Sequence, residues 1–71
     1  MTLLQVETGK EYIIERIRVS DEELLNFLFT LGCYSGEPIT VIARRSTGIF
    51  VAIKDGRYTI DAGLAQAIEV A

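Results

Sequence analysis

The sequence contains no histidine and no tryptophan, and it has only one cysteine and one proline in 71 residues. Without histidine the chain lacks the commonest general base, so Ser-His-Asp and Cys-His catalytic arrangements are excluded. A single cysteine, Cys33, cannot form a disulfide within the chain, and no oxidising compartment is implied. These absences argue against an enzyme.

Long apolar runs and clusters of basic residues are also missing. Charged residues interrupt every apolar stretch well before the ~18 residues that a membrane span needs, and no N-terminal secretion signal is visible. Ten acidic residues against seven basic ones give a net charge of −3, whereas nucleic-acid-binding domains usually carry a basic patch. We therefore expect a cytoplasmic protein without direct membrane insertion and without a nucleic-acid partner.

Hydrophobic residues make up 49% of the chain, and at this length they predict one folded domain over residues 1–71. Asp55-Gly56 favours a type I′ hairpin turn with positive φ at both residues. Five or six short strands and one helix indicate a mainly β fold, a small closed or half-closed barrel. The predicted strands include 11–19 (with a bend or a partly buried second face), 39–45, 49–54, 57–60 and 67–70, and a short helical turn is predicted near 61–66.

One α-helix is predicted at about 20–31. Ser20 as the N-cap and Glu23 form a capping box at its start, and Gly32 is the expected C-terminal stop. Four apolar residues at helical spacing predict one buried face: Leu24, Phe27, Leu28 and Leu31.

A second apolar pair on this helix, Leu25 and Phe29, lies roughly a quarter-turn from the first line of leucines. A three-turn helix on a small barrel buries one stripe, so this pair is either sunk deeply or part of a docking surface. Residues beside turns extend such a patch. The hypothesis of a partner-binding surface therefore includes Leu25, Phe29, Tyr34, Ile49 and Phe50.

A weak transition-metal site for iron or zinc is a second hypothesis. Cys33 and Glu37 offer one sulfur and one oxygen, whereas sites for zinc or ferrous iron usually have three or four ligands. The alternative interpretation is that Cys33 is a small buried apolar residue. Neither interpretation requires a cofactor.

The order of motifs along the chain is distinctive. The leucine-rich helix ends in Leu31-Gly32, followed by Cys33, a second glycine at Gly36, and a strand that alternates at Ile39, Val41 and Ala43. The chain closes on Ala65, Ile68 and Val70 in an Ala-x-x-Ile-x-Val pattern, and it opens with Leu3 and Gly9 before Tyr12 and Ile14. This arrangement resembles the FeoA family, the small ferrous iron transport protein A, over nearly the whole chain.

The resemblance implies an SH3-like barrel with a helix inserted between early strands. It implies an accessory or regulatory module that acts with the membrane ferrous iron transporter FeoB, in a domain class associated with transition-metal ion binding. A related domain lies at the C-terminus of iron-dependent repressors, joined to DNA-binding and dimerisation domains. These domains are missing here, which favours the stand-alone transport protein. A homodimer that shares a strand edge or the apolar helix is left open.

Overall fold

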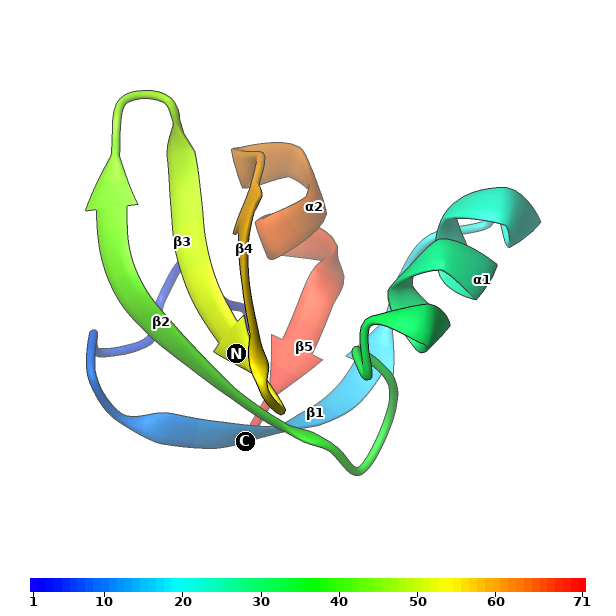
Figure 1. Ribbon diagram of the computed structural model, residues 1–71, viewed down its shortest axis with the longest axis horizontal. Helices are drawn as coiled ribbons and strands as arrows, with labels where there is room; N and C mark the ends of the chain where they lie inside the picture. Colours follow the sequence, from blue (N-terminus) through cyan, green and yellow to red (C-terminus); the bar gives the residue numbers. More distant parts are fainter.

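The computed structural model describes residues 1–71 and contains one antiparallel sheet of five strands, in the order β4-β3-β2-β1-β5, with two short helices. The sheet curves strongly round a common core, and α1 stands to one side of it (Figure 1). Neither helix is long and apolar enough to span a membrane. The elements are β1 (Glu11–Ile17), α1 (Glu22–Thr30), β2 (Pro38–Arg45), β3 (Gly48–Ile53), β4 (Gly56–Ile60), α2 (Ala62–Ala67) and β5 (Ile68–Val70).

Two irregularities in strand pairing produce the curvature. The register of β1 against β5 shifts between Ile14 and Arg16, and that of β2 against β3 shifts between Val41 and Ala43. An extra residue on one strand increases the local twist and bends the strand. Of the two alternatives expected for the first strand, the bend is thereby confirmed, and β1 can pair with β2 along one half and with β5 along the other.

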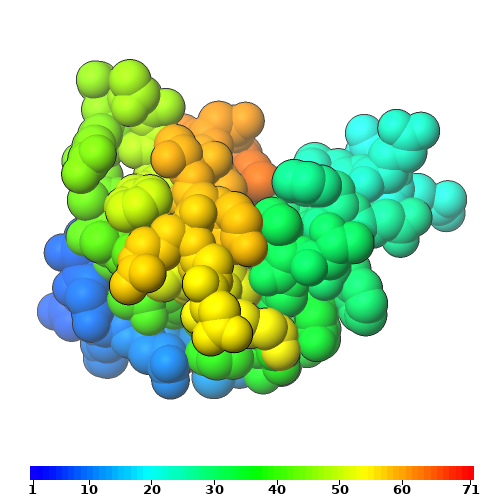
Figure 2. Space-filling view, viewed as in Figure 1, coloured from blue at the N-terminus to red at the C-terminus, as the bar shows by residue number.

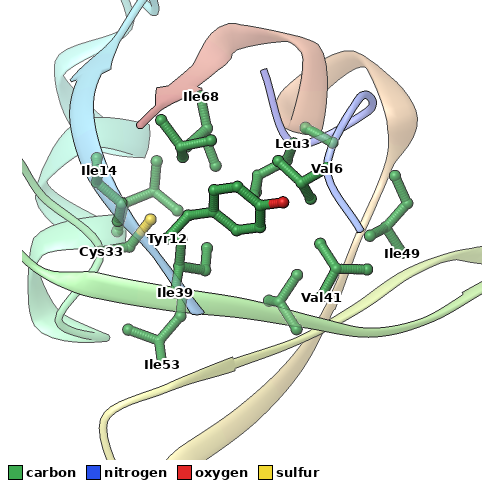
Figure 3. Packing of buried hydrophobic residues seen from close by; sticks show 14 residues of the cluster. Leu3, Val6, Tyr12, Ile14, Cys33, Ile39, Val41, Ile49, Ile53 and Ile68 are labelled. Atoms are coloured by element: carbon green, nitrogen blue, oxygen red, sulfur yellow. The ribbon is translucent and has the colours of Figure 1, made fainter. Parts of the chain in front are cut away.

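The core is built mainly from alternate residues of the strands and is entirely apolar apart from the Tyr12 hydroxyl. Its members from outside the sheet are Leu3, Val6, Leu28, Cys33 and Ala65. Tyr12 lies across its centre (Figure 3), and its hydroxyl oxygen accepts a hydrogen bond of 3.2 Å from the Glu7 N–H. No buried side-chain nitrogen or oxygen lacks a partner. The side chains buried almost completely are Leu3, Ile14, Leu28, Cys33, Ile39, Val41, Val51, Ile68 and Val70.

The N-terminal segment covers one side of this core. Its Leu3 N–H donates to the Ile68 carbonyl at 3.1 Å. The Arg44 guanidinium donates to the carbonyls of Leu3 and Val6 at 3.0 and 2.7 Å. Because Leu3 and Val6 are both buried, Arg44 holds two core residues in place through hydrogen bonds to their backbone carbonyls.

The helix α1 is shorter than predicted and begins differently. Its N-cap is Asp21 rather than Ser20, and the Asp21 carboxylate accepts hydrogen bonds from the N–H groups of Glu23 and Leu24 at 3.0 and 3.3 Å. Either residue type can cap a helix, and the aspartate carries a charge that the helix dipole favours at this end. The predicted N-cap is therefore wrong by one residue, and the Ser20–Glu23 capping box is wrong, because the third residue after Asp21 is Leu24.

The buried face of α1 is narrower than its apolar spacing predicts. Leu28 is buried and Leu24 and Leu31 are half-buried, but Phe27 is 57% exposed. The helix stands to one side of the barrel (Figure 1), and Leu28 is its one buried residue. The prediction of Phe27 as a core residue is wrong.

The β3–β4 turn also differs from its prediction. Ile53 pairs with Gly56, so the loop residues are Lys54 and Asp55, and only Lys54 among them has a positive φ, 51°. The glycine is needed for space instead, because a Cβ on Gly56 would collide with the Tyr58 hydroxyl. The expected type I′ turn centred on Asp55-Gly56 is wrong.

Candidate interaction surface

The loop after α1 is fixed to the barrel by its backbone. Gly32 ends the helix with φ +88°. The Gly36 N–H then donates to the Ile14 carbonyl at 2.8 Å, and the Ile14 N–H donates to the Glu37 carbonyl at 2.9 Å. This attachment to β1 places Tyr34 against the helix, where its ring stacks on Phe29 with centroids 4.6 Å apart.

Three of the five predicted partner-binding residues come together here. Leu25, Phe29 and Tyr34 line one open hollow of about 310 Å³, together with Ile17 of β1. Phe29 is 61% exposed, so its ring is largely in water although it belongs to an apolar cluster. An exposed apolar cluster of this kind is typical of protein interaction sites.

The other two predicted residues do not join this hollow. Ile49 is 5% exposed and belongs to the core, so it cannot contact a partner and its assignment is corrected. Phe50, its neighbour on β3, is half-buried and faces the opposite side of the strand, with the Arg45 guanidinium 5.8 Å from its ring centroid. Successive residues of a strand point to opposite faces, so the two could not lie on one surface.

One charged pair lies beside Tyr34, where a separate hollow is lined by Phe29, Tyr34 and Lys54 together. Lys54, from the β3–β4 turn, forms an ion pair with Glu37, and its Nζ lies 5.8 Å from the Tyr34 ring centroid. The hydrogen bond with Glu37 and the charge of this carboxylate raise the pKa of Lys54. The turn and the loop after α1 are thus connected through Tyr34 to the Phe29 ring.

The two residues of the metal hypothesis lie in different environments. Cys33 is 1% exposed, with its sulfur among Ile14, Tyr12 and Ile39 (Figure 3). Burial raises the pKa of its thiol to about 11, so the thiolate that metals bind is disfavoured at neutral pH. The Glu37 carboxylate already pairs with Lys54, and no group of three or more Cys, Asp or Glu side chains is placed to hold a metal.

A second hollow, of about 450 Å³, separates α1 from β4 and α2. It was not anticipated, because its wall includes Phe27, which the helical spacing assigns to the core. The remaining apolar wall comes from Leu24, Leu28, Leu31, Tyr58, Ile60 and Leu64. The helix therefore has an open apolar surface on both flanks, with Phe29 on one and Phe27 on the other.

Comparison with known proteins gives a family and a fold. Residues 1–71 match the family model of the FeoA domain, whereas the comparison with curated proteins finds no match. The solution structure of iron(II) transport protein A from Clostridium thermocellum is similar, with TM-score 0.86 and 29% identity over 99% of this chain and 44% of that one.

Two further structures have the same fold. Stenotrophomonas maltophilia FeoA complexed with zinc, described as a prokaryotic SH3 domain protein, has TM-score 0.82 and 18% identity over 100% of this chain and 89% of that one. A manganese-dependent transcriptional repressor has TM-score 0.85 and 29% identity over 100% of this chain and 40% of that one. The chain thus spans less than half the length of the Clostridium protein and of the repressor.

These similarities confirm the expected SH3-like, mainly β fold with an inserted helix. The FeoA domain is a small SH3-like domain linked to ferrous iron transport. Because the family model covers every residue, the chain belongs to the FeoA domain family.

Proposed function

We propose that this protein is a cytoplasmic accessory module of ferrous iron transport that docks on the cytoplasmic part of the FeoB transporter and modulates iron uptake. The observation that carries the proposal is the match of the FeoA domain family to all of residues 1–71. The similarity to an iron(II) transport protein A at 29% identity agrees with it.

The surface of α1 supports docking rather than chemistry. Leu25, Phe29 and Tyr34 form an apolar hollow on the outside of the molecule, and Phe29 is more exposed than any other large apolar residue. In a protein interface, an aromatic side chain of this kind typically contributes a large part of the binding energy when a partner pocket encloses it. We assign the transporter contact to these three residues.

The test measures binding of the full chain to the purified cytoplasmic domain of FeoB by calorimetry. The variant Phe29→Asp should weaken binding by about tenfold or more, because a charge replaces the anchor ring. The matched control is Phe27→Asp, on the other flank of the same helix with a similar exposure of 57%; it should bind as the parent does. Absence of binding by the parent chain, or equal loss in both variants, would contradict the proposed contact.

Modulation of transport needs a separate readout. In cells that express FeoB but lack this chain, the parent should restore uptake of radioactive ferrous iron, and Phe29→Asp should not. If Phe29→Asp restores uptake as well as the parent does, the hollow at Phe29 has no part in modulation.

A regulatory domain of a metal-dependent repressor is the second candidate function. The similarity to the manganese-dependent repressor, at TM-score 0.85 and 29% identity, favours it. The neighbouring genes distinguish the two: a transporter gene beside this one supports the transport module, and a gene for a DNA-binding domain supports the repressor.

A further inference from the structure

The outer edge of β4 is open. β4 has a single neighbour in the sheet, β3, and in an antiparallel pair every second residue directs its N–H and C=O away from the neighbouring strand. Outside the β3 ladder, no backbone group of residues 56–60 makes a hydrogen bond. These donors and acceptors are therefore available to an added strand.

The hollow between α1 and β4 lies directly against this edge. Five consecutive residues, 57–61, line it. Consecutive residues of a strand point to alternate faces of the sheet. A hollow lined by every residue of a strand therefore lies along the edge of that strand rather than over one face. The opposite wall is the apolar flank of α1, with Leu24, Phe27 and Leu28. Figure 2 shows the atoms of α1, in green, beside those of β4, in yellow to orange.

The two ends of this groove differ in charge. Asp21 and Asp61 line a hollow that continues from it, with Leu24 and Leu64 common to both. Glu22 and Glu23 are exposed in the first turn of α1 nearby.

The cations near the groove do not neutralise this end. Arg18 is already paired with Glu69 at 2.9 Å. Arg57 lies near the start of β4, three residues before the strand ends at Ile60. One end is therefore acidic and complementary to lysine or arginine on an occupant.

We propose that this groove takes an extended segment of a partner protein, which adds to the edge of β4 as a further strand. Its backbone pairs with β4, its alternate apolar side chains pack against Phe27 and Leu28, and a lysine or arginine lies near Asp61. In such β-strand additions the main chain supplies affinity and the alternate side chains supply specificity. The inference goes beyond the proposed function, because this segment is a contact separate from the FeoB contact assigned to Phe29, and it uses the other flank of α1.

The probe is a library of short random peptides displayed on phage and selected against the full chain. In the enriched sequences every second residue should be apolar, and a lysine or arginine should lie beside this alternating segment. The affinity of one selected peptide is then measured for the parent and for two variants. Phe27→Asp should weaken binding by about tenfold or more, and Phe29→Asp should leave it unchanged. Circular dichroism confirms that both variants, altered at exposed positions, are folded.

Methylation of single backbone nitrogens in the peptide tests the strand geometry. Only every second N–H of an added strand points to β4, so N-methylation at alternate positions should abolish binding and at the positions between should not. The inference is overturned if the selection enriches no sequence, or enriches helical rather than alternating patterns. It is also overturned if the effect of N-methylation does not alternate along the peptide, or if the chain self-associates and Phe27→Asp removes this self-association. Because transporter docking is assigned to Phe29, either proposal can fail without the other.

Discussion

Leu28 is the only residue of α1 that is buried from solvent, and its replacement by alanine tests how this helix is held. Apolar spacing alone assigns Leu28 and Phe27 to the same buried face, and therefore predicts similar losses of stability for the two. The structure predicts a contrast, because Leu28 is 2% exposed and Phe27 is 57% exposed.

The expected magnitude follows from the groups removed. Leu28→Ala deletes three carbon atoms, which at ~0.8 kcal/mol each removes about 2.4 kcal/mol of transfer free energy. The cavity left behind adds to this, so the total cost lies near 3 kcal/mol within the usual range of ~2–5 kcal/mol. Phe27→Ala loses less than half of the burial of a phenylalanine, about 1 kcal/mol.

These losses are large for so small a domain. At ~0.05–0.15 kcal/mol per residue, the 71 residues give a net stability of about 4–11 kcal/mol. A loss of about 3 kcal/mol lowers the Tm by about 10–25 °C in a domain of this size.

The assay is urea unfolding, monitored by far-ultraviolet circular dichroism. The free energies of unfolding of the parent and of both alanine variants are compared, provided that the three unfolding curves have the same m-value. We expect Leu28→Ala to cost at least twice as much free energy of unfolding as Phe27→Ala. Equal costs, or a cost below about 1 kcal/mol for Leu28→Ala, would refute the placement of the helix on the barrel.

Four further predictions concern other parts of the fold. Gly36→Ala should cost about 1–2 kcal/mol through its positive φ alone. Gly32→Ala should cost more than Gly36→Ala, because its Cβ would also displace the Lys54 side chain; the extra cost should vanish in the Lys54→Ala background, as urea unfolding can show. Arg44→Met should lose about 1–3 kcal/mol and speed amide exchange in the N-terminal segment, since two carbonyls lose their donor. Finally, the free energy of unfolding of the parent should fall relative to Cys33→Ala between pH 9 and 11, because the buried thiol keeps its proton up to a pKa of about 11 whereas the unfolded thiol ionises from its ordinary pKa.

Much of the fold could be predicted from the residues. Alternation at Ile39 and Val41 places both in the core, and a helix after Ser20 follows from the acidic first turn and the leucines. The errors lie where several residue types satisfy the same local rule. Ser20 and Asp21 are both good N-caps, so the sequence pattern alone does not decide between them.

The candidate surface was less predictable, because exposure depends on how deeply an element sits. Periodicity shows which residues of α1 are apolar, but not that the helix buries only Leu28 and leaves Phe27 and Phe29 in water. On β3, the residue types of Ile49 and Phe50 do not tell which of the two points inward, since both are apolar. The pairing of β3 with β2 and β4 decides it.

The most direct measurement of the central claim, that this FeoA-family chain is a docking module, is an NMR titration of the ¹⁵N-labelled protein with the cytoplasmic domain of FeoB. The proposal predicts that shifted amides cluster at Leu25, Phe29 and Tyr34 while β2 and β5 stay unchanged. No shifted amides at a high micromolar concentration of FeoB, or shifts confined to the face of β3 that carries Phe50, would contradict it.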